Sequence, residues 1–275
     1  MKQYIEDVMS GRENVCKWVK LAVQRHVNDL KRDDIYFDER AATVAIKFFQ
    51  LLRHSKGEFA GQPFILRPWQ EFVIGSIFGW KRPDGNRRFR VAYIEVPRKN
   101  GKSTLGAGVG LYMLTADGEA GAQIYTAATK YDQARIVHDE ATRMVENSPA
   151  LKRHCTLQKC NIMCPATGSF YRPLGRDSKT LDGLNPSSAI IDELHAHPDG
   201  SLYEVIDSAC GARNQPLILS ITTAGSNAFS YCKLSHHNYI EMILDNNFQD
   251  DDWFGIIYSA EEGDDPHSAK TWKKA

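Results

Sequence analysis

Hydrophobic residues recur with a helical period in the first part of the chain. Apolar side chains at three- and four-residue steps form one stripe: Val15, Val19, Ala22, Val23, Val27 and Leu30. This spacing places them on one face of a helix. A second helix is predicted from about Asp38 to Leu52, and Pro68 is expected to start a third, because proline fits the first helical turn. Residues 1–60 are therefore predicted to form an N-terminal helical segment.

From residue 89 onward, short apolar runs alternate with longer helical stretches. Buried strands are expected at 89–96, 123–127, 188–192 and 217–222, and helices at 105–114 and 131–146. Two short polar strands, near Thr156–Cys164 and Ser169–Pro173, are expected to pair as a hairpin. Apolar strands separated by helices predict an α/β fold with a mainly parallel sheet flanked by helices. Residues 61–228 are predicted to form this core.

After residue 228 the sequence predicts one helix, one strand and a polar stretch. A helix is expected at 229–247 and a strand at 253–258, and an acidic, polar stretch follows at 261–266. That composition predicts a solvated linker. The predicted C-terminal segment is 229–275, a helix, a strand and the start of a linker.

Bulk composition excludes some classes of protein. The 275 residues carry a net charge of +0, so any contact with nucleic acid requires a local patch. No apolar run is long enough to span a bilayer, and a membrane partner is not expected. Six cysteines without a signal peptide indicate reduced thiols. A zinc site at His154, Cys155, Cys160 and Cys164 is the weaker interpretation, because the spacing lacks a CxxC knuckle.

The most informative segment is the loop at 97–104, Pro-Arg-Lys-Asn-Gly-Lys-Ser-Thr. A strand, a tight loop ending in Gly-Lys-Ser and a helix form a phosphate cradle, in which backbone N–H groups face the phosphates. Lys102 is expected to reach the β- and γ-phosphates, and Ser103 to ligate Mg²⁺. The standard pattern GxxxxGK[ST] would place its first glycine at Val96. The loop predicts binding and hydrolysis of a nucleoside triphosphate.

A second strand ends in two carboxylates. Asp192 is expected to hold Mg²⁺, and Glu193 to orient and deprotonate the attacking water. The alternative is an acidic pair that caps a helix. After the next strand, Thr222, Thr223 and Ala224 are small residues that could sense the γ-phosphate, although ordinary turn chemistry also explains them.

For two further residues, the sequence gives weaker evidence of a contact with the nucleotide. Gln70, at the start of the third helix, offers an acceptor and a donor to an adenine edge. The guanidinium of Arg98 could contact the γ-phosphate. The alternatives are an exposed glutamine beside a core tryptophan and a surface arginine paired to a carboxylate. His195 and His197 are interpreted as polar surface or capping residues.

Together these segments resemble the large terminase subunit of tailed double-stranded DNA bacteriophages, the motor that pumps DNA into the procapsid. The resemblance runs from about Phe64 to Gly225 and rests on RPWQ, PRKNGKS, AIIDELH and SITTAG, in that order. It implies a P-loop NTPase fold of the RecA-like ASCE class, with ATP and Mg²⁺ as cofactors. It also implies a ring, by family analogy a pentamer, that works with double-stranded DNA, the portal protein and the small terminase subunit. The location implied is the cytoplasm of the infected host, and the full-length family member adds an RNase H-like nuclease domain.

The resemblance assigns roles to matching positions. The catalytic residues implied are Glu193, Arg98 and Lys102. The nucleotide-binding residues implied are Pro97, Arg98, Lys99, Asn100, Gly101, Lys102, Ser103, Thr104 and Gln70. The metal ligands implied are Ser103 and Asp192, and the coupling residues are Thr222, Thr223 and Ala224. Some terminases place Arg-Gly before the acidic strand, where this chain has Asp182-Gly183. An arginine acting across a subunit boundary is therefore expected at Arg176 or Arg213, unless Arg98 acts within its own subunit.

Two other functions fit parts of the sequence. Asp-Glu-Leu-His at 192–195 spells the DExH box of a superfamily 2 helicase, although no second motor domain with an arginine-rich motif is present. A nucleotide-binding scaffold without hydrolysis is the non-enzymatic alternative, and the presence of both acidic residues argues against it.

Overall fold

The protein is built around one twisted sheet, in a computed structural model that describes residues 1–176 and 183–274. The strands are β1 (Tyr36–Phe37), β2 (Trp80–Lys81), β3 (Val91–Glu95), β4 (Gln123–Ala128), β5 (Thr156–Gln158), β6 (Asn161–Cys164), β7 (Ser169–Gly175), β8 (Ser188–Asp192), β9 (Leu217–Thr222) and β10 (Trp253–Ile257). Eight of them form the main sheet in the order β10-β3-β9-β8-β4-β7-β6-β5, and β1 pairs with β2. The strands from β10 to β7 are parallel, which confirms the predicted fold class.

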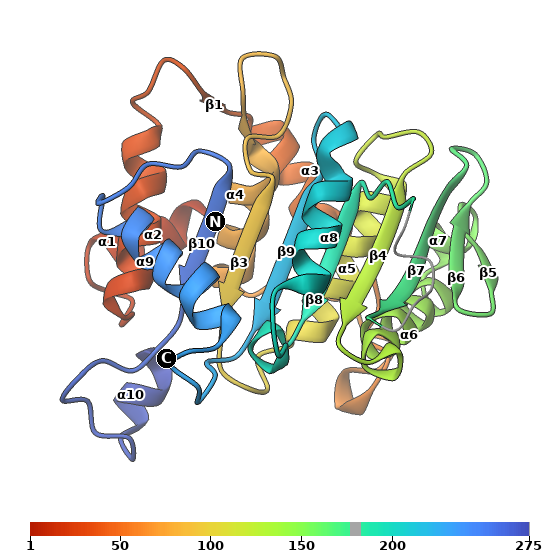
Figure 1. Ribbon diagram of the computed structural model, residues 1–275. Coiled ribbons are helices and arrows are strands. Elements are labelled where there is room, and N and C mark those ends of the chain that lie inside the picture. The colour runs from red at the N-terminus through yellow and green to blue at the C-terminus, as the bar shows by residue number, and fades with distance from the viewer. Residues whose placement is uncertain (177–182, 275) are drawn as a thin grey trace.

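Helices cover both faces of this sheet (Figure 1). They are α1 (Lys2–Met9), α2 (Lys17–Asp29), α3 (Glu39–Phe49), α4 (Pro68–Gly79), α5 (Lys102–Thr115), α6 (Tyr131–Asn147), α7 (Pro149–Lys152), α8 (Ser201–Ala209), α9 (Asn238–Leu244) and α10 (Ala269–Lys274). In the view of Figure 1, α4 and α5 lie behind the sheet, and α8 and α9 lie in front of it. The arrowheads of the parallel strands point toward one edge, so the loops that follow β3, β8 and β9 meet there.

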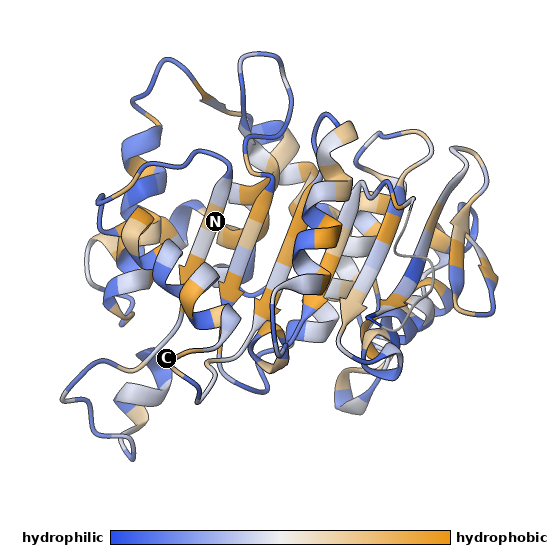
Figure 2. Cartoon of the chain, viewed as in Figure 1, coloured by the Kyte–Doolittle hydropathy of each residue, from blue (hydrophilic) through white to orange (hydrophobic). Residues whose placement is uncertain are grey.

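The hydrophobic core is continuous from the N-terminal helices to the last strand. It includes Tyr4 and Val23 at one end of the chain and Ile257 near the other. Hydrophobic residues are concentrated along the central strands and on the helices that face them (Figure 2). The predicted N-terminal segment, core and C-terminal segment therefore pack on one another through shared apolar contacts.

Helix α5 lies deep in this core, and its glycines allow close approach. A Cβ added at Gly108 would lie 2.3 Å from the ring of Phe49, and one at Gly110 would lie 2.6 Å from the ring of Tyr171. These separations are far below van der Waals contact, so only glycine permits the packing. The helix that follows the phosphate loop is thus held by α3 on one side and by β7 on another.

Two sequence expectations need correction in part. The predicted hairpin forms, because β6 pairs with β7 in antiparallel fashion. The stretch 156–164 is nevertheless two strands and not one, because Cys160 adopts a positive φ of 54° and reverses the chain between β5 and β6. The acidic stretch at 261–266 is not simply a solvated linker. Glu261 accepts a hydrogen bond from the backbone N–H of Lys17 at 2.5 Å, and Asp264 pairs with Lys274 of α10 at 2.8 Å.

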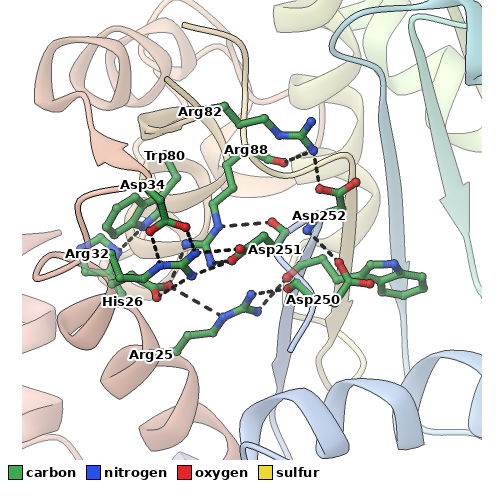
Figure 3. Close-up of polar contacts among 12 residues, drawn as sticks. Arg25, His26, Arg32, Asp34, Trp80, Arg82, Arg88, Asp250, Asp251 and Asp252 are labelled. Carbon is green, nitrogen blue, oxygen red and sulfur yellow. Dashed lines mark hydrogen bonds and ion pairs between the residues drawn. The ribbon is translucent and has the colours of Figure 1, made fainter. Parts of the chain in front are cut away.

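An ion-pair cluster joins the N-terminal helices to the approach to β10 (Figure 3). The guanidinium of Arg88 is fully buried, lies 2.7 Å from Asp29 of α2, and also pairs with Asp251. Arg32 donates to both oxygens of Asp251 at 2.7 Å. The hydrogen bonds from Arg32, together with the charge of Arg88, hold the pKa of Asp251 below its usual range. The stability that Asp251 contributes is therefore present at neutral pH and is lost as the pH falls below the usual carboxyl pKa.

We expect Asp29→Asn to lower the free energy of unfolding by about 3 kcal/mol, because it removes a carboxylate from the buried guanidinium of Arg88. Asp34→Asn is the matched control: its side chain is 66% exposed in its pair with Arg32, and we expect a loss below about 1 kcal/mol. Urea unfolding followed by circular dichroism measures both. Equal losses in the two variants would contradict the role given to Asp29.

Candidate active site

The order of the strands brings three loops to one edge of the sheet. Strand β9 lies between β3 and β8, with Thr222 opposite Glu95 and Ile221 opposite Asp192. Because all three strands are parallel, their carboxyl ends coincide. The phosphate loop, the acidic pair and the segment after β9 are thus neighbours, although far apart in sequence.

The phosphate loop is tightly turned. Lys99 and Gly101 have positive φ angles of 70° and 73°, and Gly101 is the N-cap of α5. A positive φ is unusual for lysine and indicates a backbone held by its surroundings. Lys102 begins the helix and is only 7% exposed. The N-terminus of α5 and its first lysine therefore face the same edge, as a phosphate cradle requires.

The structure explains the absent first glycine. Val96, which occupies that position, is buried, and its N–H donates to the carbonyl of Thr222 at 3.0 Å. The chain thus stays extended for one residue beyond β3 and continues its pairing with β9. No positive φ is needed at Val96, so valine serves there.

The acidic pair stands opposite the loop. The hydroxyl of Ser103 lies 3.5 Å from a carboxylate oxygen of Asp192, whose other oxygen accepts from the Glu193 N–H at 3.1 Å. Burial, together with the neighbouring charge of Glu193, raises the pKa of Asp192 to about 6. A buried carboxylate whose charge is only partly compensated, beside a hydroxyl, is a donor set that suits Mg²⁺. Ser103 and Asp192 are the residues that would hold the ion.

Glu193 is held by His195 and by Thr223, one of the predicted coupling residues. Its φ is 50°, and one carboxylate oxygen lies 3.2 Å from Nδ1 of His195 and 3.5 Å from the hydroxyl of Thr223. The Thr222 hydroxyl lies 2.9 Å from the same His195 nitrogen and accepts from the backbone N–H of His195 at 3.1 Å. His195 therefore connects the predicted base to both predicted coupling threonines.

This placement corrects the interpretation of both histidines. His195 packs into the site rather than serving as a surface or capping residue. His197 is only 4% exposed, and burial lowers the pKa of its ring. Ala224, by contrast, is exposed and lines a cavity of about 180 Å³ with Glu95 and Lys233. The sequence signal for His195 was its place as the last residue of Asp-Glu-Leu-His, directly after the acidic pair.

Gln70 is buried against the loop rather than exposed. Its side-chain oxygen accepts the backbone N–H of Arg67 at 2.9 Å and caps α4. A Cβ added at Gly101 would lie 3.9 Å from the side-chain amide nitrogen of Gln70, so the two residues are neighbours. Gln70, Lys99 and Gly101 line a cavity of about 740 Å³. One lone pair of the amide oxygen is thus occupied, and the amide nitrogen makes no hydrogen bond within the described residues.

Arg98 makes no contact with the acidic pair in the described residues. It is exposed and lines a cavity of about 410 Å³ that Trp69, Tyr258 and Trp272 also line. Among residues 1–176 and 183–274, Arg98 has no hydrogen-bond or ion-pair partner. The alternative of a surface arginine paired to a carboxylate therefore does not describe it.

The two other candidate arginines lie at opposite edges of the sheet. Arg176 follows β7 at the edge of the phosphate loop and pairs with Asp199 at 3.0 Å. Arg213 lies at the far edge, where it pairs with Glu119 at 2.6 Å and donates to the carbonyls of Gly121 and Asn185. These bonds give Arg213 a structural role and argue against its predicted action on a neighbour's nucleotide. Asp182, where some terminases carry an arginine, lies outside the described residues.

The described part of the chain has neither a metal-binding cluster nor a membrane-spanning helix. No cluster of three or more His, Cys, Asp or Glu side chains there could hold a metal ion, which includes the cysteines around β5 and β6. No helix in the same residues is both long and apolar enough to cross a membrane.

One family model and two known protein sequences match this chain. The family model for the terminase large subunit, ATPase domain, matches residues 68–241. The large terminase subunit of Enterobacteria phage HK97 is 31% identical over 177 residues, which are 62% of this chain and 34% of that protein. Protein YmfN of Escherichia coli K12 is 42% identical over 94 residues, 34% of this chain and 20% of that protein.

A solved structure of a terminase large subunit also matches the fold of this chain. The crystal structure of the HK97 bacteriophage large terminase superimposes with a TM-score of 0.72 and 26% identity, covering 84% of this chain and 46% of that one. This chain thus spans about a third to a half of the HK97 protein. Because the family model matches more than half of its residues, the chain belongs to the family of terminase large subunit ATPase domains.

Proposed function

We propose that this chain hydrolyses ATP as the motor domain of a terminase large subunit that drives double-stranded DNA into a procapsid. The observation that carries the proposal is the convergence of Lys102, Ser103, Asp192 and Glu193 at one edge of the sheet. Membership in the terminase family supports the DNA-packaging role. The partners proposed are neighbouring copies in a ring, by analogy a pentamer, with the portal protein and the small subunit, in the cytoplasm of the infected host.

Binding and chemistry are divided among the loop residues and the acidic pair. The backbone of residues 97–104 and the ammonium of Lys102 would neutralise the β- and γ-phosphates. Ser103 and Asp192 would hold Mg²⁺, which supplies positive charge next to the phosphate oxygens. Glu193 would accept a proton from the attacking water, at the oxygen that the neighbouring His195 and Thr223 hold in place.

The same contacts suggest how hydrolysis is sensed. Thr222 and Thr223 share Nδ1 of His195 with Glu193, so a shift of the carboxylate on loss of the γ-phosphate would pull on both threonines. Ala224 continues this segment into the cavity beside Glu95. We propose that 222–224 is the coupling segment and that its movement starts the displacement of a DNA-gripping surface.

The first test is Glu193→Gln. We expect turnover to fall by about 10²–10⁴-fold while ATP binding is retained, because the variant keeps the shape of the side chain and loses the base. Steady-state phosphate release and equilibrium titration with a fluorescent ATP analogue measure the two effects. The exposed Glu262→Gln is the control. Normal turnover in Glu193→Gln would refute the assignment.

A second prediction concerns His195. We expect His195→Ala to lower kcat by about tenfold or more with little change in KM, because His195 positions the base rather than holding ATP. His195→Asn, which keeps a donor near the carboxylate, should recover part of the loss. His267→Ala, at an exposed site, is the control. Equal kcat in His195→Ala and the control would contradict the positioning role.

A third prediction concerns the source of the arginine. Because Arg98 makes no contact with the acidic pair in the described residues, we expect turnover per chain to rise with protein concentration as neighbours complete the site. Arg176→Ala should lower the high-concentration rate by about 10³-fold or more. Lys102→Ala provides the blank. Concentration-independent turnover that Arg98→Ala abolishes would instead place the arginine within the same subunit.

A further inference from the structure

A buried ion pair joins β3, the strand before the phosphate loop, to helix α9. Glu95 is the last residue of β3 and is only 3% exposed. One of its carboxylate oxygens accepts from the hydroxyl of Tyr93 at 2.6 Å and lies 2.8 Å from Nδ1 of His237. The other ring nitrogen of His237 lies 3.0 Å from a carboxylate oxygen of Glu241, one helical turn further along the chain. The contacts therefore run from β3 directly into α9.

Both partners of this pair carry charge. An ionised carboxylate only accepts hydrogen bonds, so a histidine between two carboxylates donates from both ring nitrogens, which makes its ring positively charged. Burial alone would raise the pKa of Glu95, but the hydrogen bond and the charge of His237 offset it and hold that pKa below its usual value. Because the pair is withdrawn from water, removing one partner leaves the other uncompensated. The pair is therefore a stiffer connection than one between exposed side chains.

Two consecutive residues hold both ends of the stretch 222–237. The N–H of Val96 donates to the carbonyl of Thr222, where the stretch leaves β9. Glu95, directly before Val96, holds His237 at the other end. The stretch that begins with the proposed coupling segment is thus a loop fastened at both ends to the backbone immediately before the phosphate loop.

Between these ends the chain is loosely held. Residues 224–229 are all exposed and form neither helix nor strand, and 224–228 line a cavity of about 180 Å³ together with Glu95 and His237. The π-helix Lys233–His237 follows, and such wide turns are rare and occur frequently at functional sites. An exposed loop moves at little cost in free energy, so it transmits displacement poorly. The buried pair is the more direct route from the nucleotide site to α9.

Helix α9 is positioned to pass a displacement onward. It packs against α2 and β10 and lies in front of the sheet in Figure 1. The ammonium of Lys17 in α2 lies 2.8 Å from a carboxylate oxygen of Asp245, the residue directly after α9. A shift of α9 would therefore reach the N-terminal helices.

We propose that His237 is a positioning residue that links the nucleotide site to α9 through Glu95, so that nucleotide binding orders α9. Nucleotide bound to residues 97–104 would fix the backbone at 95 and 96, and the pair would pass this restraint on. This inference rests on the proposed function and names the element through which nucleotide binding reaches the rest of the chain. The side-chain hydrogen bonds of His237 within the described residues are to Glu95 and Glu241, outside the phosphate loop. A pair that only stabilises the fold is the competing interpretation.

The test is amide hydrogen exchange across α9, measured by mass spectrometry on the full chain with and without saturating Mg²⁺ and a non-hydrolysable ATP analogue. His237→Ala removes the link, and His237→Gln keeps a side-chain donor for Glu95. Glu241→Gln is the matched control, because it removes a carboxylate from the same helix and leaves the pair with Glu95 in place. Titration with a fluorescent ATP analogue shows binding in every variant, and thermal melting shows folding.

We expect nucleotide to slow exchange in α9 by about fivefold or more in the unmodified chain and in Glu241→Gln, which is the low end of typical coupling between two sites. His237→Ala should bind nucleotide and show no slowing, and His237→Gln should retain part of it. If His237→Ala does not fold, a reduced response in His237→Gln would support the proposal and a full response would overturn it.

Slowing of the same size in His237→Ala, with only a lower melting temperature, would show a purely structural pair and overturn the inference. Absence of slowing in an unmodified chain that binds nucleotide would also overturn it. Both results leave the proposed function standing. Failure of the unmodified chain to bind nucleotide would instead overturn the proposed function together with this inference.

Discussion

Two backbone hydrogen bonds to the end of β9 hold the active site together. The N–H of Val96, at the start of the phosphate loop, donates to the carbonyl of Thr222, and the N–H of Glu193 donates to the carbonyl of Ile221. One strand end therefore fixes both the loop proposed to bind phosphates and the acidic pair opposite it. The relative position of these two segments depends on β9 lying between β3 and β8. A shift of the end of β9, at Ile221 and Thr222, would therefore displace both segments.

The site holds charge and backbone in arrangements that a purely stable fold would avoid. Asp192 is buried beside Glu193 with only partial compensation from Lys102, which raises its pKa to about 6. Lys99 and Glu193 both adopt positive φ angles. Each feature is unfavourable by itself and is maintained by the surrounding sheet and helices. A cation bound beside Asp192 would offset the repulsion between the two carboxylates.

Paired charges join the N-terminal helices to the last strand. The guanidinium of Arg88 is buried and lies between Asp29 of α2 and Asp251, in the segment before β10. Asp251 is partly exposed and is also held by Arg32. Because a buried guanidinium is stable only when carboxylates face it, this cluster fixes α2 against the approach to β10.

The sequence by itself determined the fold class, the phosphate loop and the acidic pair. Local patterns are enough for these, because apolar periodicity specifies buried strands and helices, and the Gly-Lys-Ser tripeptide carries its chemistry within three residues. Tertiary structure decided the rest. Strand order and side-chain direction decided the contact of His195 with Glu193, the capping bond of Gln70, the far-edge position of Arg213 and the exposure of Arg98 beside the cavity that Trp69 also lines. Strand order is set by contacts between residues distant in sequence, which periodicity along the chain does not encode.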